Sequence, residues 1–251
     1  MVISLRNVSF EYSRRPVFQD LNLQVGAFPT VVLGPNGAGK STLLGLIVGQ
    51  LQPTSGAVSV DDGERKGRQA IERLRKKTGW LPQDVKPLPG FNTRQQVAYA
   101  GWLKGMSHKN AWAAAADALR MVGLETFLER SASKLSGGQR RRLGMAQALV
   151  HRPRYLVLDE PYAGLDPEQR SLVRDTMKEL SASTALVIST HQTEDLEDVY
   201  SHVVIIEDGY VVFSGSTSQF YEFAPREIPS TVRAEVAYRN ILSKSRSEVH
   251  R

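Results

Sequence analysis

The 251-residue sequence contains no cysteine. Disulfide bridges and metal sites built from thiolates are therefore excluded, and the absence fits a reducing compartment such as the cytoplasm. No apolar stretch approaches the roughly 20 residues that a membrane-spanning helix needs, and residues 1–6 lack the layout of a signal peptide. If the protein works at a membrane, we expect a partner to hold it there.

Acidic residues are the smaller charged group, with 26 against 32 lysines and arginines, which gives a net charge of +6. Such an excess suits nucleic acid or an anionic membrane surface. The positive charge is scattered, however, apart from Arg140–Arg142 and a basic tail over residues 226–251. We therefore expect no binding to nucleic acid. Hydrophobic residues make up 41% of the chain, which is enough for a buried core in one α/β domain with small appendages.

A glycine-rich segment follows the apolar run of residues 31–33 and precedes a leucine-rich run over residues 43–47. A strand, a loop and a helix are expected there. The first N–H groups of a helix are unpaired and carry partial positive charge, and glycines let them converge on one anion. The segment matches the phosphate loop, in which the lysine reaches the terminal phosphates and the serine hydroxyl ligates magnesium. Its residues are Gly34, Pro35, Asn36, Gly37, Ala38, Gly39, Lys40, Ser41 and Thr42.

Two acidic residues, Asp159 and Glu160, end the apolar run of residues 155–158. Ligands bind at the carboxyl ends of the strands in open α/β sheets. We expect Asp159 to hold magnesium, directly or through water, and Glu160 to orient and polarise the water that attacks the γ-phosphate. A solvated strand end is the alternative, and the phosphate loop in the same chain argues against it.

A second glycine-rich segment contains Ser136, Gly137, Gly138 and Gln139 and precedes apolar residues at helical spacing. A serine followed three residues later by glutamine is a capping-box pattern, and the two glycines expose N–H groups at the start of the helix. The segment is thus a second anion site, although one nucleotide needs only one phosphate cradle. In isolation, an ordinary N-cap is the better interpretation.

Strands are expected in the chain over about residues 3–12, 17–25, 56–60, 78–81, 155–158, 185–189, 203–207 and 211–213, and residues 93–150 are helix-rich. The first two runs form an antiparallel pair, and the last two form a hairpin. Short uninterrupted apolar runs such as the fifth to seventh fit a parallel sheet that is covered on both faces. The tail is expected to be helical or partly ordered.

With these motifs in this order, the chain resembles the ATP-binding subunit of an ATP-binding-cassette (ABC) transporter over about residues 1–220. Residues 135–139 match the family signature letter for letter. The resemblance implies a P-loop NTPase fold of the RecA-like kind. Its parallel-sheet core carries an N-terminal antiparallel β subdomain and an inserted α-helical subdomain. The implied ATPase domain covers residues 1–225, with its core at about 1–85 and 153–225, the insert at about 86–152, and the tail at 226–251.

The resemblance also implies a head-to-tail dimer. The signature of one copy contacts the γ-phosphate of ATP held by the other copy, which accounts for the second anion site. Tyr12 falls where the family places an aromatic ring that stacks on adenine, and local packing within its strand is the alternative. Gln83 matches the glutamine that senses magnesium and the transmembrane partner.

Two further positions carry a family role. Asp166 matches the loop that crosses the dimer interface, and an N-cap aspartate followed by Pro167 is a compatible second interpretation. His191 matches the switch histidine that contacts the γ-phosphate, and a merely exposed histidine at a strand end is the alternative. The expected catalytic residues are thus Glu160, His191 and Lys40, and the expected magnesium ligands are Ser41, Gln83 and Asp159.

The expected function is ATP binding and hydrolysis that power a membrane transporter, with ATP and Mg²⁺ bound. The expected partners are a transmembrane permease subunit and a second ATPase subunit, identical or homologous. The insert and the Gln83 loop form the groove for a short helix of the permease, with Phe91, Tyr99, Trp102 and Leu103 as candidate contacts. A peripheral location at the cytoplasmic face of the membrane follows.

The direction of transport is inferred from local resemblance only. Residues 89–93, 103–106 and 189–195 look more like export-type members, which favours export of a small molecule. Two alternatives stay open: a non-transport ABC ATPase that acts on nucleic acid or the ribosome, and a regulatory P-loop NTPase. The first usually has a coiled-coil insertion or a second cassette, and the second lacks the signature.

Overall fold

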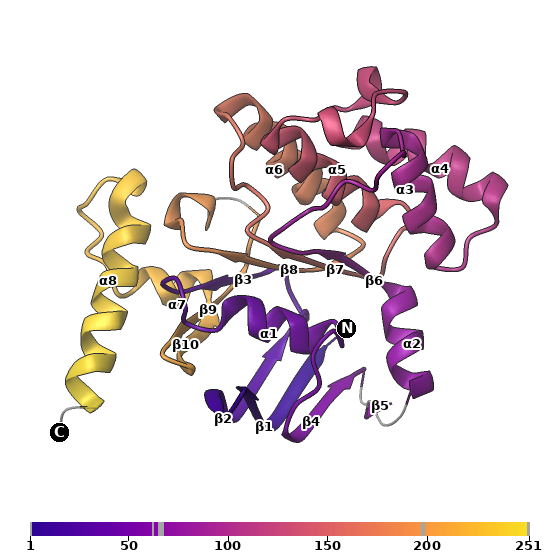
Figure 1. Cartoon of the computed structure of the whole chain (residues 1–251). Coiled ribbons are helices and arrows are strands. Elements are labelled where there is room, and N and C mark those ends of the chain that lie inside the picture. Colours follow the sequence, from indigo (N-terminus) through magenta and orange to yellow (C-terminus); the bar gives the residue numbers. More distant parts are fainter. Residues whose placement is uncertain (1, 62, 65–67, 197–198, 250–251) are drawn as a thin grey trace. The chain divides into compact units, whose positions relative to one another are not determined.

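The computed structural model describes residues 2–61, 63–64, 68–196 and 199–249 (Figure 1). The chain divides into two compact units. One comprises Met1–Arg65 and Leu186–Arg251, and the other comprises Lys66–Ala185.

The first unit contains an antiparallel sheet with the strand order β2-β1-β4-β5. Along β1, the apolar residues Leu5, Val8 and Phe10 are buried, while the polar residues Arg6, Asn7 and Glu11 are exposed. This alternation gives the sheet one apolar face. The predicted pairing of the first two strands is confirmed. The strands are β1 (Ile3–Tyr12), β2 (Arg15–Val25), β4 (Ser55–Val60) and β5 (Gly63–Glu64).

Parallel strands form the other part of the first unit. The strand β3 (Thr30–Leu33) is buried at every residue and lies between β8 (Ala185–Thr190) and β9 (His202–Glu207), parallel to both. The predicted hairpin is confirmed, because β10 (Tyr210–Ser216) pairs antiparallel with β9. Continuous burial of β3, and of all but the first residue of β8 and β9, explains why these three strands carry apolar runs without alternation. The helix α1 (Lys40–Ile47) follows β3 after the glycine-rich loop.

The C-terminal residues of the first unit are helical. After α7 (Thr217–Tyr221), the helix α8 (Ser230–Val249) packs against α7, β10 and the 3₁₀ helix η3 (Thr193–Leu196). Arg246 fixes α8 by donating from Nε and Nη2 to Oε1 of Glu207, at 2.8 and 2.6 Å. The sequence predicted a tail that is either helical or partly ordered, and the structure shows a helix over Ser230–Val249. Residues 250–251 lie outside the described residues.

The second unit combines two parallel strands, β6 (Thr78–Leu81) and β7 (Tyr155–Asp159), with a group of helices. Helices α3, α4 and α5 pack on one another (Figure 1). Side chains cap several of them: Asn92 begins α3 with a capping box, and Asp166 begins α6 with Pro167 as its first residue. The helices are α2 (Arg68–Lys77), α3 (Thr93–Leu103), α4 (His108–Met121), η1 (Glu125–Phe127), η2 (Ala132–Lys134), α5 (Gly137–Leu149) and α6 (Pro167–Ser181).

Every strand expected from the sequence is present, whereas α2 and β5 were not predicted. Among the helices described, none is both long and apolar enough to cross a bilayer. The division into a core, a helical insert at about 86–152 and a tail stays a prediction.

Candidate functional site

The phosphate loop and His191 both belong to the first unit, and both follow its parallel strands at the same edge. The last residue of β3, Leu33, lies opposite Thr190 of β8 and Ile205 of β9. Gly34 follows Leu33, and His191 follows Thr190, so both segments start at the same level. His191 is exposed. The structure thus brings two segments together that are more than 150 residues apart in the sequence.

Two positions of the loop favour glycine. At the start of the loop close packing leaves no room for a side chain, and at its end the backbone is left-handed. A Cβ atom on Gly34 would lie 2.3 Å from the carbonyl oxygen of Ile206, so no side chain fits. Gly39 is the N-cap of α1 with a φ of 104°, and no side chain caps this helix. No side chain thus caps the N-terminus of α1, an arrangement that suits the binding of a phosphate group.

The ammonium group of Lys40 lies within the curve of the loop. Lys40 is only 7% exposed, and its Nζ donates to the carbonyl oxygens of Gly34 at 2.7 Å and Pro35 at 3.1 Å. The neighbouring Ser41 is exposed, and Thr42 is buried. The loop thus presents a full positive charge together with helix N–H groups, the donor set that a polyphosphate requires.

Tyr12, the last residue of β1, belongs to the same unit as the loop. Tyr12 is 49% exposed, and its ring meets that of Phe10 edge-on, with the ring centroids 4.8 Å apart. This contact holds the ring on one side and leaves much of it open to solvent. An exposed, positioned aromatic ring is suited to stacking on a base.

The second unit repeats this arrangement of strand ends. Leu81 at the end of β6 lies opposite Leu158 of β7. Gln83 and the pair Asp159–Glu160 therefore emerge at one edge. Asp159 is 2% exposed, Glu160 is half-buried, and Gln83 is exposed. Glu160 has a φ of 51°, which is unusual for a residue with a side chain.

Arg141 of α5, which the sequence analysis noted only as part of a basic run, connects these two strand ends. Its Nη1 donates to the carbonyl oxygens of Pro82 at 2.6 Å and Gln83 at 2.8 Å, and its Nε donates to the carbonyl oxygen of Glu160 at 3.1 Å. Burial lowers the pKa of Arg141 to about 10, and the negative charges of Asp159 and Glu160 oppose that shift. In the sequence, only its position two residues after the signature could have indicated that Arg141 has a role at the site.

The signature segment begins α5 with the predicted capping box. The backbone N–H of Gln139 donates to Ser136 Oγ at 3.2 Å, and the N–H of Ser136 donates to Gln139 Oε1 at 3.0 Å. A Cβ on Gly138 would lie 3.0 Å from the carbonyl oxygen of Gly164. The signature therefore packs directly on the segment 164–166, which the sequence assigned to the dimer interface.

Asp166 caps α6, as its second interpretation predicted. Its side chain accepts from the N–H of Gln169 at 2.8 Å. This contact explains why an aspartate stands at the start of α6. The role of Asp166 at a dimer interface stays a prediction.

The predicted site residues thus fall into two groups, one in each unit. Hard oxygen ligands, which magnesium prefers, occur in both: the Ser41 hydroxyl in one, and the Gln83 amide and the Asp159 carboxylate in the other. In the part of the chain that the structure describes, no cluster of three or more His, Cys, Asp or Glu residues is present.

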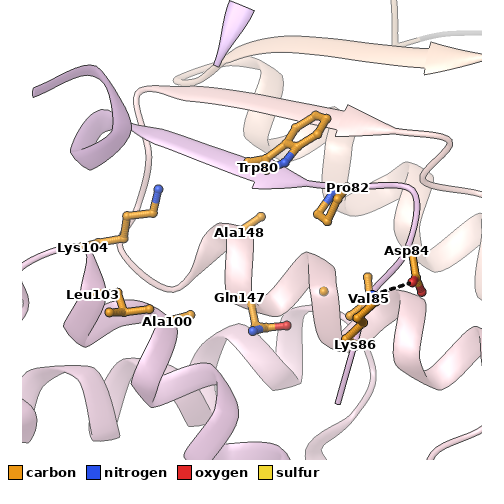
Figure 2. A pocket seen from close by; sticks show the side chains of 11 residues that line it. Trp80, Pro82, Asp84, Val85, Lys86, Ala100, Leu103, Lys104, Gln147 and Ala148 are labelled. Atoms are coloured by element: carbon orange, nitrogen blue, oxygen red, sulfur yellow. Dashed lines mark ion pairs between the residues drawn. The ribbon is translucent and has the colours of Figure 1, made fainter. Parts of the chain in front are cut away.

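A pocket of about 310 Å³ lies between helices α3 and α5 and the segment of residues 82–86, here called the Gln83 segment (Figure 2). Lys104 at its rim donates from Nζ to the carbonyl oxygens of Arg75 at 2.6 Å and Thr78 at 2.8 Å. Burial and the charge of Arg75 lower the pKa of Lys104 to about 8. The lining residues are Trp80, Pro82, Asp84, Val85, Lys86, Ala100, Leu103, Lys104, Gly144, Gln147 and Ala148.

Exposed apolar side chains lie on α3, the helix that lines the pocket through Ala100 and Leu103. Leu103 is 60% exposed and Trp102 is 55% exposed. Tyr99 stacks on Trp102 with ring centroids 5.8 Å apart, and Phe91 meets Tyr99 edge-on. Of the four contacts predicted for the groove, only Leu103 lines the pocket itself.

Comparison with known proteins identifies the family. The sequence profile described as "ABC transporter" matches residues 18–163, more than half of the chain. The chain is 35% identical to the energy-coupling factor transporter ATP-binding protein EcfA2 of Streptococcus thermophilus, which covers 88% of this chain and 84% of the relative. It is also 35% identical to the Nod factor export ATP-binding protein I of Burkholderia lata, over 88% of this chain and 72% of the relative.

Solved structures agree with the sequence relatives. The dimeric bacterial ABC transporter cassette MJ0796 superposes with a TM-score of 0.78 at 26% identity, over 85% of this chain and 98% of that chain. A further structure of MJ0796 is a post-hydrolysis state bound to ADP and Pi. The chain belongs to the ABC transporter ATP-binding family. It is an ATP-binding subunit with the P-loop NTPase fold that the sequence predicted.

Proposed function

We propose that this chain hydrolyses ATP to power the export of a small molecule through a membrane permease, and that two ATPase subunits close head to tail on two nucleotides. One observation carries the proposal: the chain has two glycine-rich helix N-termini in separate units, and only the one at α1 lacks a side-chain cap. In this proposal, a second copy holds the nucleotide that the signature contacts.

The first unit binds the nucleotide in this proposal. Tyr12 stacks on the adenine, and the N–H groups of residues 34–42 with Lys40 hold the phosphates. Lys40 Nζ exchanges its two carbonyl acceptors, Gly34 and Pro35, for phosphate oxygens. A phosphate oxygen is the stronger acceptor because the hydrogen bond joins two charged groups. His191, which follows the neighbouring strand, contacts the γ-phosphate.

The second unit supplies the groups for hydrolysis. Glu160 orients the attacking water and accepts its proton, which requires a fixed carboxylate. Magnesium bound by Ser41, Gln83 and Asp159 would neutralise charge on the phosphates. Ser136, Gly137, Gly138, Gln139 and Asp166 contact the nucleotide held by the other copy.

The pocket beside Gln83 is the proposed docking site for a short helix of the transmembrane subunit. Its place supports this role, because the lining residues Pro82 and Asp84 flank Gln83 in the chain. Exposed Trp102 and Leu103 on α3 extend the apolar surface beyond the pocket. Aromatic and aliphatic side chains of this kind anchor protein interfaces. Such a complex places the chain at the cytoplasmic face of the membrane as a peripheral subunit.

Export is the proposed direction, supported by the local sequence resemblance and by a relative named for export. The energy-coupling factor relative is equally similar, so the direction needs its own assay. Vesicles containing the coexpressed permease, oriented with the ATPase outside, should accumulate the transported molecule when ATP is added. Loss of preloaded molecule instead would show uptake into the cell.

Substitution of Glu160 by Gln tests the core of the proposal. Glu160→Gln removes the proton acceptor but keeps the shape, so ATP binding should persist while hydrolysis falls by at least about 100-fold. Without hydrolysis, a dimer with two trapped ATP molecules should accumulate. Analytical ultracentrifugation with Mg-ATP measures the dimer, and phosphate release measures the turnover.

Glu168→Gln is the matched control, because Glu168 is an exposed glutamate in the first turn of α6. It should hydrolyse ATP at the wild-type rate and form no lasting dimer. Wild-type turnover in Glu160→Gln would contradict the assignment of the base, and a trapped complex that is monomeric would contradict the dimer.

A further inference from the structure

We propose that Arg141 is a positioning residue: it couples the segment that borders the docking pocket to the backbone that aims Glu160. The inference rests on the proposed function, because it concerns how Glu160 is held for hydrolysis. Arg141 contacts neither of the glycine-rich loops through the hydrogen bonds described above. It acts through two other segments of the second unit.

Arg141 is 5% exposed, and all three of its hydrogen bonds go to backbone carbonyls, of Pro82, Gln83 and Glu160. One guanidinium group therefore fixes the segment after β6 relative to the segment after β7. Guanidinium donors lie in a rigid plane, so a displacement of one acceptor shifts the geometry of the others.

The backbone of Glu160 is strained. Its φ of 51° lies in the left-handed region, which is energetically unfavourable for residues with a side chain. The carbonyl oxygen of Glu160 accepts from Arg141 Nε and from the N–H of Ala163, at 3.1 Å each. These contacts hold the strained conformation, and that conformation sets the direction of the Glu160 carboxylate.

The helix α5 connects Arg141 to the pocket. Gly144, one helical turn after Arg141 in α5, lines the pocket. A Cβ on Gly144 would lie 2.5 Å from Val85 Cγ2 and 2.6 Å from Leu81 Cδ1. The helix therefore touches the Gln83 segment on both sides of the two carbonyls that Arg141 holds. A helix pressed into the pocket moves this segment against α5, and Arg141 passes the displacement to Glu160.

Arg141 also has an unused donor. Arg141 Nη2 is buried and has no hydrogen-bond partner among the described residues. An unsatisfied buried donor is energetically unfavourable. Arg141 thus has capacity for one more acceptor when the two segments shift.

The adjacent Arg142 offers a matched comparison in the same helix. It is 7% exposed and donates from Nη1 to the carbonyl oxygens of Val122 at 3.0 Å and Gly123 at 2.8 Å. Both acceptors follow α4, and neither belongs to the strand ends that carry Gln83 and Glu160. Arg142 therefore shares the burial and the type of hydrogen bond of Arg141, but not its acceptors.

The experiment compares Arg141→Met with Arg142→Met in the full chain. For Arg141→Met, kcat for ATP should fall about 10–100-fold, because a catalytic group displaced by about 1 Å loses rate on this scale. KM for ATP should stay within about twofold of wild type, and the ATP-bound dimer should last longer. For Arg142→Met, kcat per folded molecule should change by less than about threefold. Steady-state kinetics, ultracentrifugation and thermal melting measure these quantities.

Arg141→Lys serves if the methionine variant melts below the assay temperature. A lysine keeps the positive charge but lacks the planar fork, so kcat should remain at least about fivefold reduced with KM unchanged. Equal kinetics of Arg141→Lys and wild type would overturn the inference. So would a parallel loss of kcat and ATP affinity in the two methionine variants, which indicates a purely structural role.

Gly144→Ala tests the connection to the pocket. The added methyl group pushes Val85 and Leu81 away from α5, which should lower kcat without changing ATP affinity. In a double-mutant cycle, Gly144→Ala should have little further effect once Arg141 is methionine, because both changes act along one route. Additive losses would contradict the coupling. Absence of ATP hydrolysis in the wild-type chain would instead contradict the proposed function.

Discussion

The two glycine-rich helix N-termini are built in opposite ways. At α1, the N-cap is Gly39, no side chain accepts from the helix, and Lys40 donates to carbonyls of its own loop. At α5, Ser136 and Gln139 form a complete capping box, and Gly138 packs on the segment of Gly164. The N-terminus of α1 thus has no side-chain cap, whereas that of α5 is capped by two side chains of its own.

We infer from this difference that α1 binds the nucleotide, whereas α5 is contacted by another copy of the chain. At an N-terminus without a side-chain cap, a phosphate group can accept from the helix N–H groups, so we expect α1 to supply affinity. A capped N-terminus keeps its shape without a ligand, so α5 offers a rigid surface that another copy can contact without an ordering cost. The comparison predicts that changes at α1 affect nucleotide binding, whereas changes at α5 affect stability and dimer formation.

The largest expected effect is that of Lys40→Ala. Removal of the ammonium group deletes the only full charge within the described loop, so the affinity for ATP should fall by about 100-fold or more. Isothermal titration with Mg-ATP measures the affinity. Lys134→Ala, which removes an exposed lysine near the signature, is the control and should bind ATP as wild type does. Unchanged affinity in Lys40→Ala would refute the assignment of the loop.

The second prediction sharpens the comparison within α5. Gly138→Ala places a methyl group 2.9–3.0 Å from Gln169 and Gly164, so it should lower the free energy of unfolding by about 1–3 kcal/mol. The matched variant Gly137→Ala meets nothing within 4 Å, and its stability should be unchanged or higher because alanine favours a helix.

Dimer formation should respond differently from stability in this pair. In the Glu160→Gln background, Gly137→Ala should weaken the ATP-dependent dimer, because its methyl group faces the other copy's nucleotide in the proposed complex. Thermal melting and ultracentrifugation separate the two effects. A stable Gly137→Ala chain that dimerises as tightly as the parent would contradict the role of the signature.

The smallest expected effect is that of Ser136→Ala. It removes the side-chain half of the capping box, which typically costs about 1 kcal/mol, or a melting temperature lower by about 2–4 °C. Ser216→Ala removes the equivalent serine from the capping box of α7 and should cost a similar amount. Only Ser136→Ala should also weaken the ATP-dependent dimer, and equal dimerisation of the two variants would limit Ser136 to capping.

Local sequence patterns predicted much of this structure. The phosphate loop, the capping box at Ser136 and the strand of Asp159 each depend on neighbouring residues, and each is present as expected. Proline after Asp166 likewise predicted the start of α6. Such features were accessible because their physical causes lie within about five residues.

Contacts between distant segments were not predictable in the same way. Arg141 read as one member of a basic run, and only the folded chain brings Pro82, Gln83 and Glu160 to its guanidinium group. The groove was expected at the Gln83 loop and the helical insert, with Leu103 among its candidate contacts. The rest of the lining was not predictable, because it depends on how α5 packs against residues 80–86. The left-handed backbone of Glu160 has no local signal, since glutamate carries no preference for it.

The most direct measurement asks whether the signature of one copy meets the phosphate loop of another. The chain lacks cysteine, so single cysteines can be placed at will: Asn36→Cys at the exposed loop in one Glu160→Gln preparation, and Lys134→Cys beside the signature in a second. After mixing, a short bifunctional maleimide should join the two kinds of chain only when Mg-ATP is present. A mixture that gives no joined product with Mg-ATP, or gives as much without it, would contradict the composite site.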